Sequence, residues 1–133
     1  MVDAGTWRKL SSNPIFPHSD GDEWDPRPSA PHILRVGGKL RMYYYGERDG
    51  RRGKERRIGF AEAPLDDPYT WTRHPGNPVL DLAAPGELDS VWASYPWVVP
   101  ITDTLWYMYY AAFGDELVTR AHGGESFKLN HTM

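Results

Sequence analysis

The chain has no cysteine among its 133 residues. This absence rules out disulfides, thiol catalysis and cysteine-ligated metal, and it leaves the redox compartment open. The sequence also lacks an apolar run of the roughly 18 residues that a membrane span needs, and its N-terminus "MVDAGTWRKL" has no apolar core of a signal peptide. We therefore expect a soluble, cytoplasmic chain with no membrane partner.

Neither sign of charge is in large excess. The 15 basic and 18 acidic residues give a net charge of -3, which provides no electrostatic basis for binding nucleic acid or an anionic membrane. No P-loop, dinucleotide fingerprint or Ser-His-Asp order is present, so no cofactor is expected. The acidic stretch "DGDEWD" has no glycine and no terminal glutamate at the spacing of a calcium loop, so we predict a solvated turn and no metal site.

Aromatic and turn-forming residues are plentiful. Aromatics make up 14 % of the chain, and 13 glycines and 12 prolines accompany them. This composition favours many short strands and turns over long helices. With 40 % hydrophobic residues the chain has enough apolar side chains for a core, so we predict an all-β fold in one small domain or in a piece of a larger one.

The sequence repeats itself once. "WRKLSSNPIF" from Trp7 aligns without a gap on "WTRHPGNPVL" from Trp71, at an offset of 64 residues. A Met-Tyr-Tyr triplet at Met42 recurs at Met108, at an offset of 66. Small drift of this kind belongs in loops, so the chain is predicted to contain two copies of one structural unit.

Each unit is predicted to contain four short antiparallel strands. The expected strands are 31–36, 39–45, 57–63 and 71–74 in the first unit, and 95–100, 105–112, 116–122 and 127–130 in the second. The Gly37-Gly38 pair is the strongest hairpin signal, residues 46–56 are expected to form a polar loop, and residues 6–10 a lone leading strand. The predicted boundaries are 1–22 for the leading strand and loop, 23–80 for the first unit and 81–133 for the second.

The pattern "NPIF…EWD…APHIL…GGKLRMYYYG…RIGFAEA…WTRHPGNPVL" resembles the five-bladed β-propeller glycoside hydrolases. That superfamily includes arabinanases, β-xylosidases, invertases, levansucrases and β-mannoside phosphorylases. The similarity runs from Trp7 to Phe127. It implies four-stranded propeller blades, here about two of the five, and a carbohydrate-active protein of the glycosidase type.

The resemblance also implies where catalytic groups would lie. The family's chemistry uses two carboxylates about 5 to 9 Å apart in a central funnel, and one of them commonly precedes a proline at the start of an inner strand. Here Ala30 and Tyr95 occupy those positions, and the nearest carboxylates are Asp25 and Asp89. Asp25 and Asp89 are the catalytic candidates; alternatively, they cap loop turns, which their repetition in both units favours because a catalytic group is needed once.

Several side chains near the predicted inner strands are candidates for binding a sugar. Flat aromatic faces stack on sugar rings, but aromatic residues also pack between blades. The aromatic candidates are Trp24, Trp92, Tyr95 and Trp97. His32 either points into the funnel or is a hydrogen-bonded structural residue. The basic run "RDGRRGKERR" is predicted to be an exposed hairpin loop, with contact to a phosphate or a sugar acid as the alternative.

Two blades alone would leave bare faces and open strand edges. We therefore expect a fragment of a propeller, a homo-oligomeric ring, or a chain whose edges another protein covers. The leading functional hypothesis is a carbohydrate-active propeller, or a part of one, that acts on glycosidic bonds with a carboxylate pair. The alternative is a non-catalytic sugar-binding or degenerate unit. This alternative is favoured by Ala30 and Tyr95, which occupy the positions where a catalytic aspartate is expected.

Overall fold

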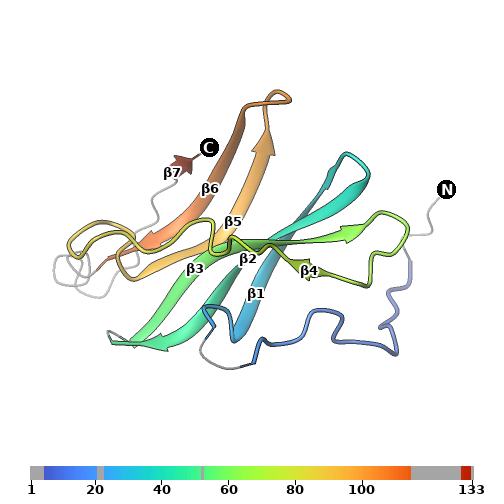
Figure 1. The fold of residues 1–133 in the computed structure, drawn as a ribbon, viewed down its shortest axis with the longest axis horizontal. Helices are drawn as coiled ribbons and strands as arrows, with labels where there is room; N and C mark the ends of the chain where they lie inside the picture. The colour runs from blue at the N-terminus through green and yellow to red at the C-terminus, as the bar shows by residue number, and fades with distance from the viewer. Residues whose placement is uncertain (1–4, 21–22, 52, 115–129, 133) are drawn as a thin grey trace.

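The computed structural model describes residues 5–20, 23–51, 53–114 and 130–132, and these residues form strands, turns and irregular segments without a helix (Figure 1). The all-β prediction is therefore confirmed. The strands are β1 (Arg27–Val36), β2 (Lys39–Gly50), β3 (Gly53–Pro64), β4 (Thr72–Arg73), β5 (Trp92–Pro100), β6 (Trp106–Phe113) and β7 (Asn130–Thr132). In the part of the chain that the structure describes, no helix is long and apolar enough to cross a membrane.

The first four strands form an antiparallel unit in the order β1-β2-β3-β4, as the repeat predicts. The hairpin between β1 and β2 turns at Gly37-Gly38, and Gly37 has a φ of 60°. Glycine adopts this left-handed conformation without the steric penalty that a Cβ brings. The strongest hairpin signal of the sequence is thus confirmed.

The predicted polar loop at residues 46–56 is wrong. β2 continues to Gly50 and β3 begins at Gly53, so most of the stretch predicted to be a loop lies in the two strands. Charges of opposite sign face each other across this hairpin, with Glu47 opposite Arg56, and cross-strand pairs of this kind stabilise a ladder. The charged run therefore extends the hairpin into one of the longest elements of the fold.

The strand pairing between the second unit and the first is limited to one residue pair. β5 pairs in parallel with β3 only at Arg56 and Trp92, and it pairs antiparallel with β6 over its length (Figure 1). β7 pairs with the other edge of β6. The strand predicted at 116–122 lies outside the described residues, as does most of the one predicted at 127–130.

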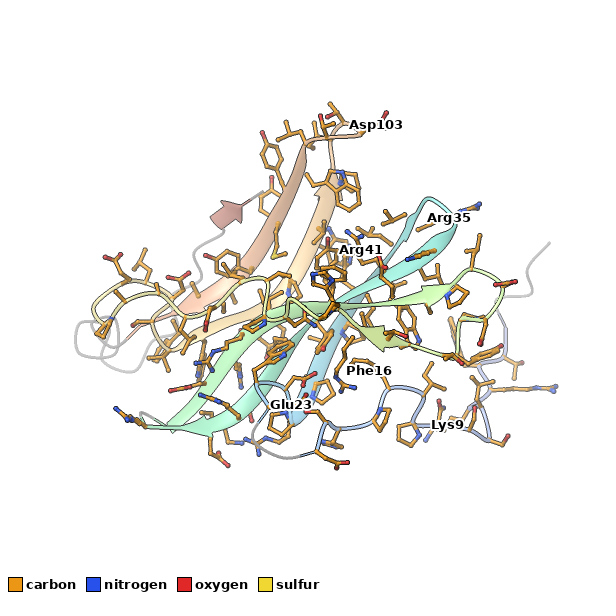
Figure 2. The ribbon with its side chains drawn as sticks, in the orientation of Figure 1. Lys9, Phe16, Glu23, Arg35, Arg41 and Asp103 are labelled. Carbon is orange, nitrogen blue, oxygen red and sulfur yellow. The ribbon has the colours of Figure 1, made fainter. Side chains whose placement is uncertain are left out.

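The predicted leading strand at residues 6–10 is wrong. This segment is irregular and exposed, and Trp7 is 97 % exposed. A strand needs a partner for its backbone groups, and among the described residues none pairs with this segment. The N-terminal residues instead run below the first unit, where Phe16 lies against the sheet (Figure 2).

Two apolar clusters hold these parts together. One lies between the units and combines Tyr45 and Ile58 of the first with Ala93, Tyr110 and Ala112 of the second. The other covers the opposite face of the first unit. There Met42, Tyr44 and Ala61 pack beneath Phe16, Trp24 and Trp71. Each face of the first unit therefore carries part of the apolar core.

Candidate functional site

β1 and β5, the first strands of the two units, are bent at the same place. Their pairing registers shift between Ser29 and His32 and between Ser94 and Trp97. Within these bulges Ala30 has a φ of 51° and Tyr95 a φ of 54°. L-residues avoid this region by roughly 1–2 kcal/mol, and strained residues and bulges gather where a strand must aim a side chain at a functional site. The structure thus singles out the two positions that stand before the prolines.

Tyr95 and Trp97 present aromatic rings to solvent from β5. Tyr95 is 53 % and Trp97 is 61 % exposed, while Pro96 and Val98 between and after them are buried. The Tyr95 ring packs edge-on against Tyr45, with 5.2 Å between the ring centroids. We call Tyr95 and Trp97 the aromatic surface.

His32 supports the aromatic surface from the neighbouring unit. Its ring centroid lies 4.3 Å from that of Trp97, and its Nε2 is 3.1 Å from the carbonyl oxygen of Val98. The contact links β1 to β5. This geometry favours the structural alternative for His32, which orients Trp97 instead of pointing freely into a funnel.

Asp25 is fully buried and both of its polar partners come from the first unit. Tyr44 Oη donates to Asp25 Oδ2 at 2.7 Å, and Arg73 Nε donates to the same oxygen at 2.8 Å. Burial and the hydrogen bond to the carboxylate raise the pKa of Tyr44 above its usual range, so the phenol stays protonated and acts as the donor. The carboxylate therefore anchors the loop before β1 to β2 and β4.

Asp89 repeats this arrangement in the second unit. Tyr110 Oη donates to Asp89 Oδ2 at 2.9 Å, and Tyr110 is the Met-Tyr-Tyr residue that corresponds to Tyr44. The same anchor in both units, which we call the Asp–Tyr pair, favours the scaffold role for these two aspartates. Their catalytic role stays a prediction.

Trp24 and Trp92 are both engaged in packing. Trp24 stacks on Tyr44 at 5.4 Å between centroids and lies against Gly46, where a Cβ would come within 2.8 Å of its ring. Trp92 Nε1 donates to the carbonyl oxygen of Lys54 at 2.7 Å, and the Arg56 guanidinium lies 4.2 Å above its ring. These contacts favour the packing alternative for both tryptophans.

Asn77 and Arg73 complete the scaffold. The Asn77 side chain accepts from the Phe60 backbone N–H at 3.0 Å and donates to the Phe60 carbonyl at 2.9 Å, which satisfies backbone groups of β3. The Asn-Pro motif of the repeat thus has a structural role. Arg73 was not a candidate from the sequence. A signal was present, because the two aligned copies both have a basic residue at this position, Lys9 and Arg73.

Metal binding has no support in the described ranges, where no group of three or more His, Asp or Glu side chains could hold an ion.

Comparison with known proteins gives a likeness among solved structures. No family model matches the chain, and neither does any curated protein. Among solved structures, the fold is similar to a chain described as "Glycoside hydrolase", with a TM-score of 0.60 and 22 % sequence identity. The match covers 83 % of this chain and 29 % of that one, so this chain spans less than a third of its length. The fold is therefore that of a glycoside hydrolase-like all-β protein.

Proposed function

We propose that this chain is a unit of a carbohydrate-active propeller of the glycoside hydrolase type, and that it binds a glycoside through the aromatic surface. The observation that supports this proposal most strongly is the exposure of Tyr95 and Trp97 on a strand that is bent at the residue before Pro96. The likeness to a glycoside hydrolase fold agrees with it.

The chemistry of the aromatic surface suits a neutral sugar. The C–H faces of a sugar ring are apolar, and aromatic rings bind such faces through dispersion and burial. Large aromatic side chains with half or more of their surface in water are candidates for ligand contact when they lie together. The contact with His32 restricts the orientation of the Trp97 ring, so the Trp97 side chain loses less conformational entropy when a sugar binds.

The test compares aromatic residues of the same type at different places. Titration of the protein with neutral arabino-, xylo- and manno-oligosaccharides, followed by calorimetry and NMR, should give saturable binding to at least one series. Tyr95→Ala and Trp97→Ala should each weaken that binding by about tenfold, the loss of roughly 1.4 kcal/mol of stacking.

The matched controls are Tyr69→Ala and Trp7→Ala, since both rings are exposed elsewhere on the chain. Their affinities should equal that of the unchanged protein. Equal weakening by the control pair, or no binding of any oligosaccharide by a folded protein, would remove the proposal.

Catalysis by Asp25 and Asp89 is the second candidate function, because these are the carboxylates nearest in sequence to the starts of the two inner strands. It requires that hydrolysis or phosphorolysis of an aryl glycoside be lost in Asp25→Asn and in Asp89→Asn while the fold is retained. Turnover that persists in both variants would leave these aspartates with the scaffold role alone.

A further inference from the structure

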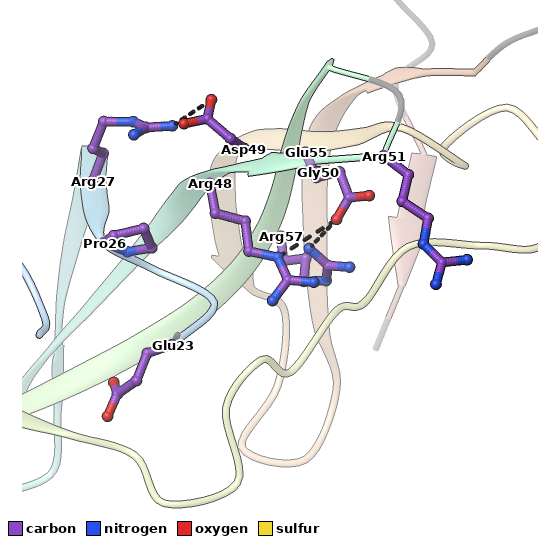
Figure 3. A pocket seen from close by; sticks show the side chains of 9 residues that line it. All are labelled: Glu23, Pro26, Arg27, Arg48, Asp49, Gly50, Arg51, Glu55 and Arg57. Carbon is purple, nitrogen blue, oxygen red and sulfur yellow. Dashed lines mark hydrogen bonds and ion pairs between the residues drawn. The ribbon is translucent and has the colours of Figure 1, made fainter. Parts of the chain in front are cut away.

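The long β2–β3 hairpin and the start of β1 enclose a pocket of about 660 Å³ (Figure 3). Its volume lies in the range of roughly 300–1,000 Å³ that small-molecule sites occupy. Four arginines line it, against three carboxylates: Arg27, Arg48, Arg51 and Arg57. We call it the arginine pocket.

Glu55 organises one side of the arginine pocket. Its Oε2 lies 3.0 Å from Arg57 Nη1 and 3.5 Å from Arg48 Nε, so one carboxylate is shared by two guanidinium groups (Figure 3). Gly50 makes this position possible, because a Cβ there would lie 2.2 Å from Glu55 Cδ. The glutamate folds over the glycine and leaves the two arginines side by side.

The other carboxylates of the arginine pocket are engaged at its edge or face solvent. Asp49 pairs with Arg27 at 3.3 Å, but the Asp49 side chain is largely exposed, and water and salt weaken such a pair. Arg57 also binds Asp81, outside the pocket lining, at 2.6 Å. Two of its N–H donors, on Nε and Nη1, are therefore engaged.

Arg48 and Arg51 keep unused donors. Arg48 meets Glu55 only at 3.5 Å through Nε, which is longer than a hydrogen bond, and within the described ranges no residue pairs with the Arg51 guanidinium. Figure 3 shows Arg51 reaching outward from the hairpin turn. A guanidinium presents five N–H donors in a planar fork that matches the oxygens of a phosphate or a carboxylate.

We propose that the arginine pocket binds an oxyanion, a phosphate group or the carboxylate of a sugar acid, through Arg48 and Arg51. The excess of one positive charge in the lining provides the attraction, and the shared Glu55 holds Arg48 in place. The site goes beyond the neutral-sugar contact proposed above. The arginine pocket lies near the aromatic surface along β1. Arg27 of the pocket is two residues from Ser29. Ser29 pairs with Tyr45, whose ring contacts Tyr95.

The experiment uses three probes on the full chain: inorganic phosphate, glucuronate and, as a neutral reference, glucose. NMR or calorimetric titration should show saturable binding of phosphate, glucuronate or both, weakened by added salt, and none of glucose at the pocket. Phosphate alone identifies a phosphate site, and glucuronate alone identifies a sugar-acid site. Failure of both overturns the proposal.

Variants connect the binding to the pocket. Arg48→Gln and Arg51→Gln should each weaken binding of the anion by about tenfold. Arg51 lies in an exposed turn, so its replacement leaves the fold intact. The matched control is Arg35→Gln, an exposed arginine at the opposite end of β1, which should bind as the unchanged protein does (Figure 2).

Anion affinity that is unchanged in both pocket variants, or lowered equally in Arg35→Gln, would overturn the assignment. This test is independent of the aromatic surface, since it uses inorganic phosphate without a sugar. The loss of oligosaccharide binding in Trp97→Ala and the loss of phosphate binding in Arg51→Gln therefore report two different sites.

Discussion

Asp25 is the charged side chain most fully removed from water in the described part of the chain. A buried carboxylate destabilises a fold unless hydrogen bonds and an opposite charge compensate it. Tyr44 and Arg73 provide both, and Arg73 also donates to the carbonyl of Pro17 at 2.8 Å. Asp25 and Arg73 together thus tie the N-terminal segment, the loop before β1 and β4 to the same point on β2.

Removing this carboxylate should destabilise the fold. We expect Asp25→Ala to lower the free energy of unfolding by about 3 kcal/mol, because Tyr44 and Arg73 lose a buried partner. Asp103→Ala, at the exposed β5–β6 turn, should change it by less than about 0.5 kcal/mol (Figure 2). Urea denaturation of the two variants measures the difference, and equal midpoints would contradict the anchoring role.

The positions that matter were visible in the sequence, but their environments were not. Asp25, Asp89, Ala30 and Tyr95 stand out because each recurs at a matched place beside an inner strand. The burial of Asp25 depends on contacts with distant residues such as Tyr44, which no local pattern contains. Arg73 was missed for the same reason, since its partner lies 48 residues away.

At the scale of elements, the β2–β3 hairpin shows how a charged run forms strands. The sequence was interpreted as a loop because of its polarity, but its charges alternate in complementary order around the turn. Register places Glu47, Arg48 and Asp49 opposite Arg56, Glu55 and Lys54. This mirror order of signs, with Gly50 and Gly53 flanking the turn, is a signal that the sequence contains and that predicts the longer hairpin.

The ion pairs of the hairpin should make stability depend on acid. Burial opposes the ionisation of Glu47, but hydrogen bonds from Lys54 and Arg56 outweigh it and hold the pKa of Glu47 below its usual value of 4.5. Because folding lowers this pKa, the ionised Glu47 stabilises the fold at pH values above 4.5. This contribution is lost as the pH falls through the pKa of Glu47 in the folded state.

We therefore expect the urea midpoint to drop below about pH 4.5, with a smaller drop in Glu47→Gln. Glu87→Gln, whose side chain is exposed, is the control and should keep the full pH dependence. Parallel curves for the unchanged protein and Glu47→Gln would show that Glu47 contributes nothing to it.

Two glycines of β2 and its preceding turn test how closely the elements pack. A Cβ at Gly46 would lie 2.3 Å from the Cβ and 2.5 Å from the Cα of Asp25, whereas one at Gly38 would meet nothing within 4 Å. Gly46→Ala should lower the free energy of unfolding by about 1–3 kcal/mol, since backbone must move. Gly38→Ala should have little effect in the same thermal or urea melts, and a comparable loss in both variants would contradict the close approach of the loop to β2.

At the scale of the whole molecule, the contacts between the two units include one ladder pair, Arg56 with Trp92, the apolar cluster around Tyr45 and Ile58, and the contact of His32 with Val98. Other apolar side chains remain in water. Exposed large residues include Ile33, Val79, Trp97 and Ile101. Exposed apolar area of this kind favours association, and the chain spans only 29 % of the glycoside hydrolase that it resembles in fold.

We expect the isolated chain to associate at micromolar concentration, measured as a mass above that of one copy by size-exclusion chromatography with light scattering. Ile33→Ser, in the middle of β1, should lower this association, because Ile33 is 49 % exposed on the open side of the strand. Leu65→Ser, in a turn, should not. A single-copy mass with one cooperative unfolding transition would contradict the expectation.

The Asp–Tyr pairs have a consequence for how such a chain grows. Each unit contains both partners of its own anchor, Asp25 with Tyr44 and Asp89 with Tyr110, so neither anchor depends on a residue of the other unit. A gene segment that encodes such a unit can be duplicated in tandem, and the new copy then contains both the aspartate and the tyrosine that anchor its loop. The offset of about 64 residues between the two copies is then the length of one such repeat unit.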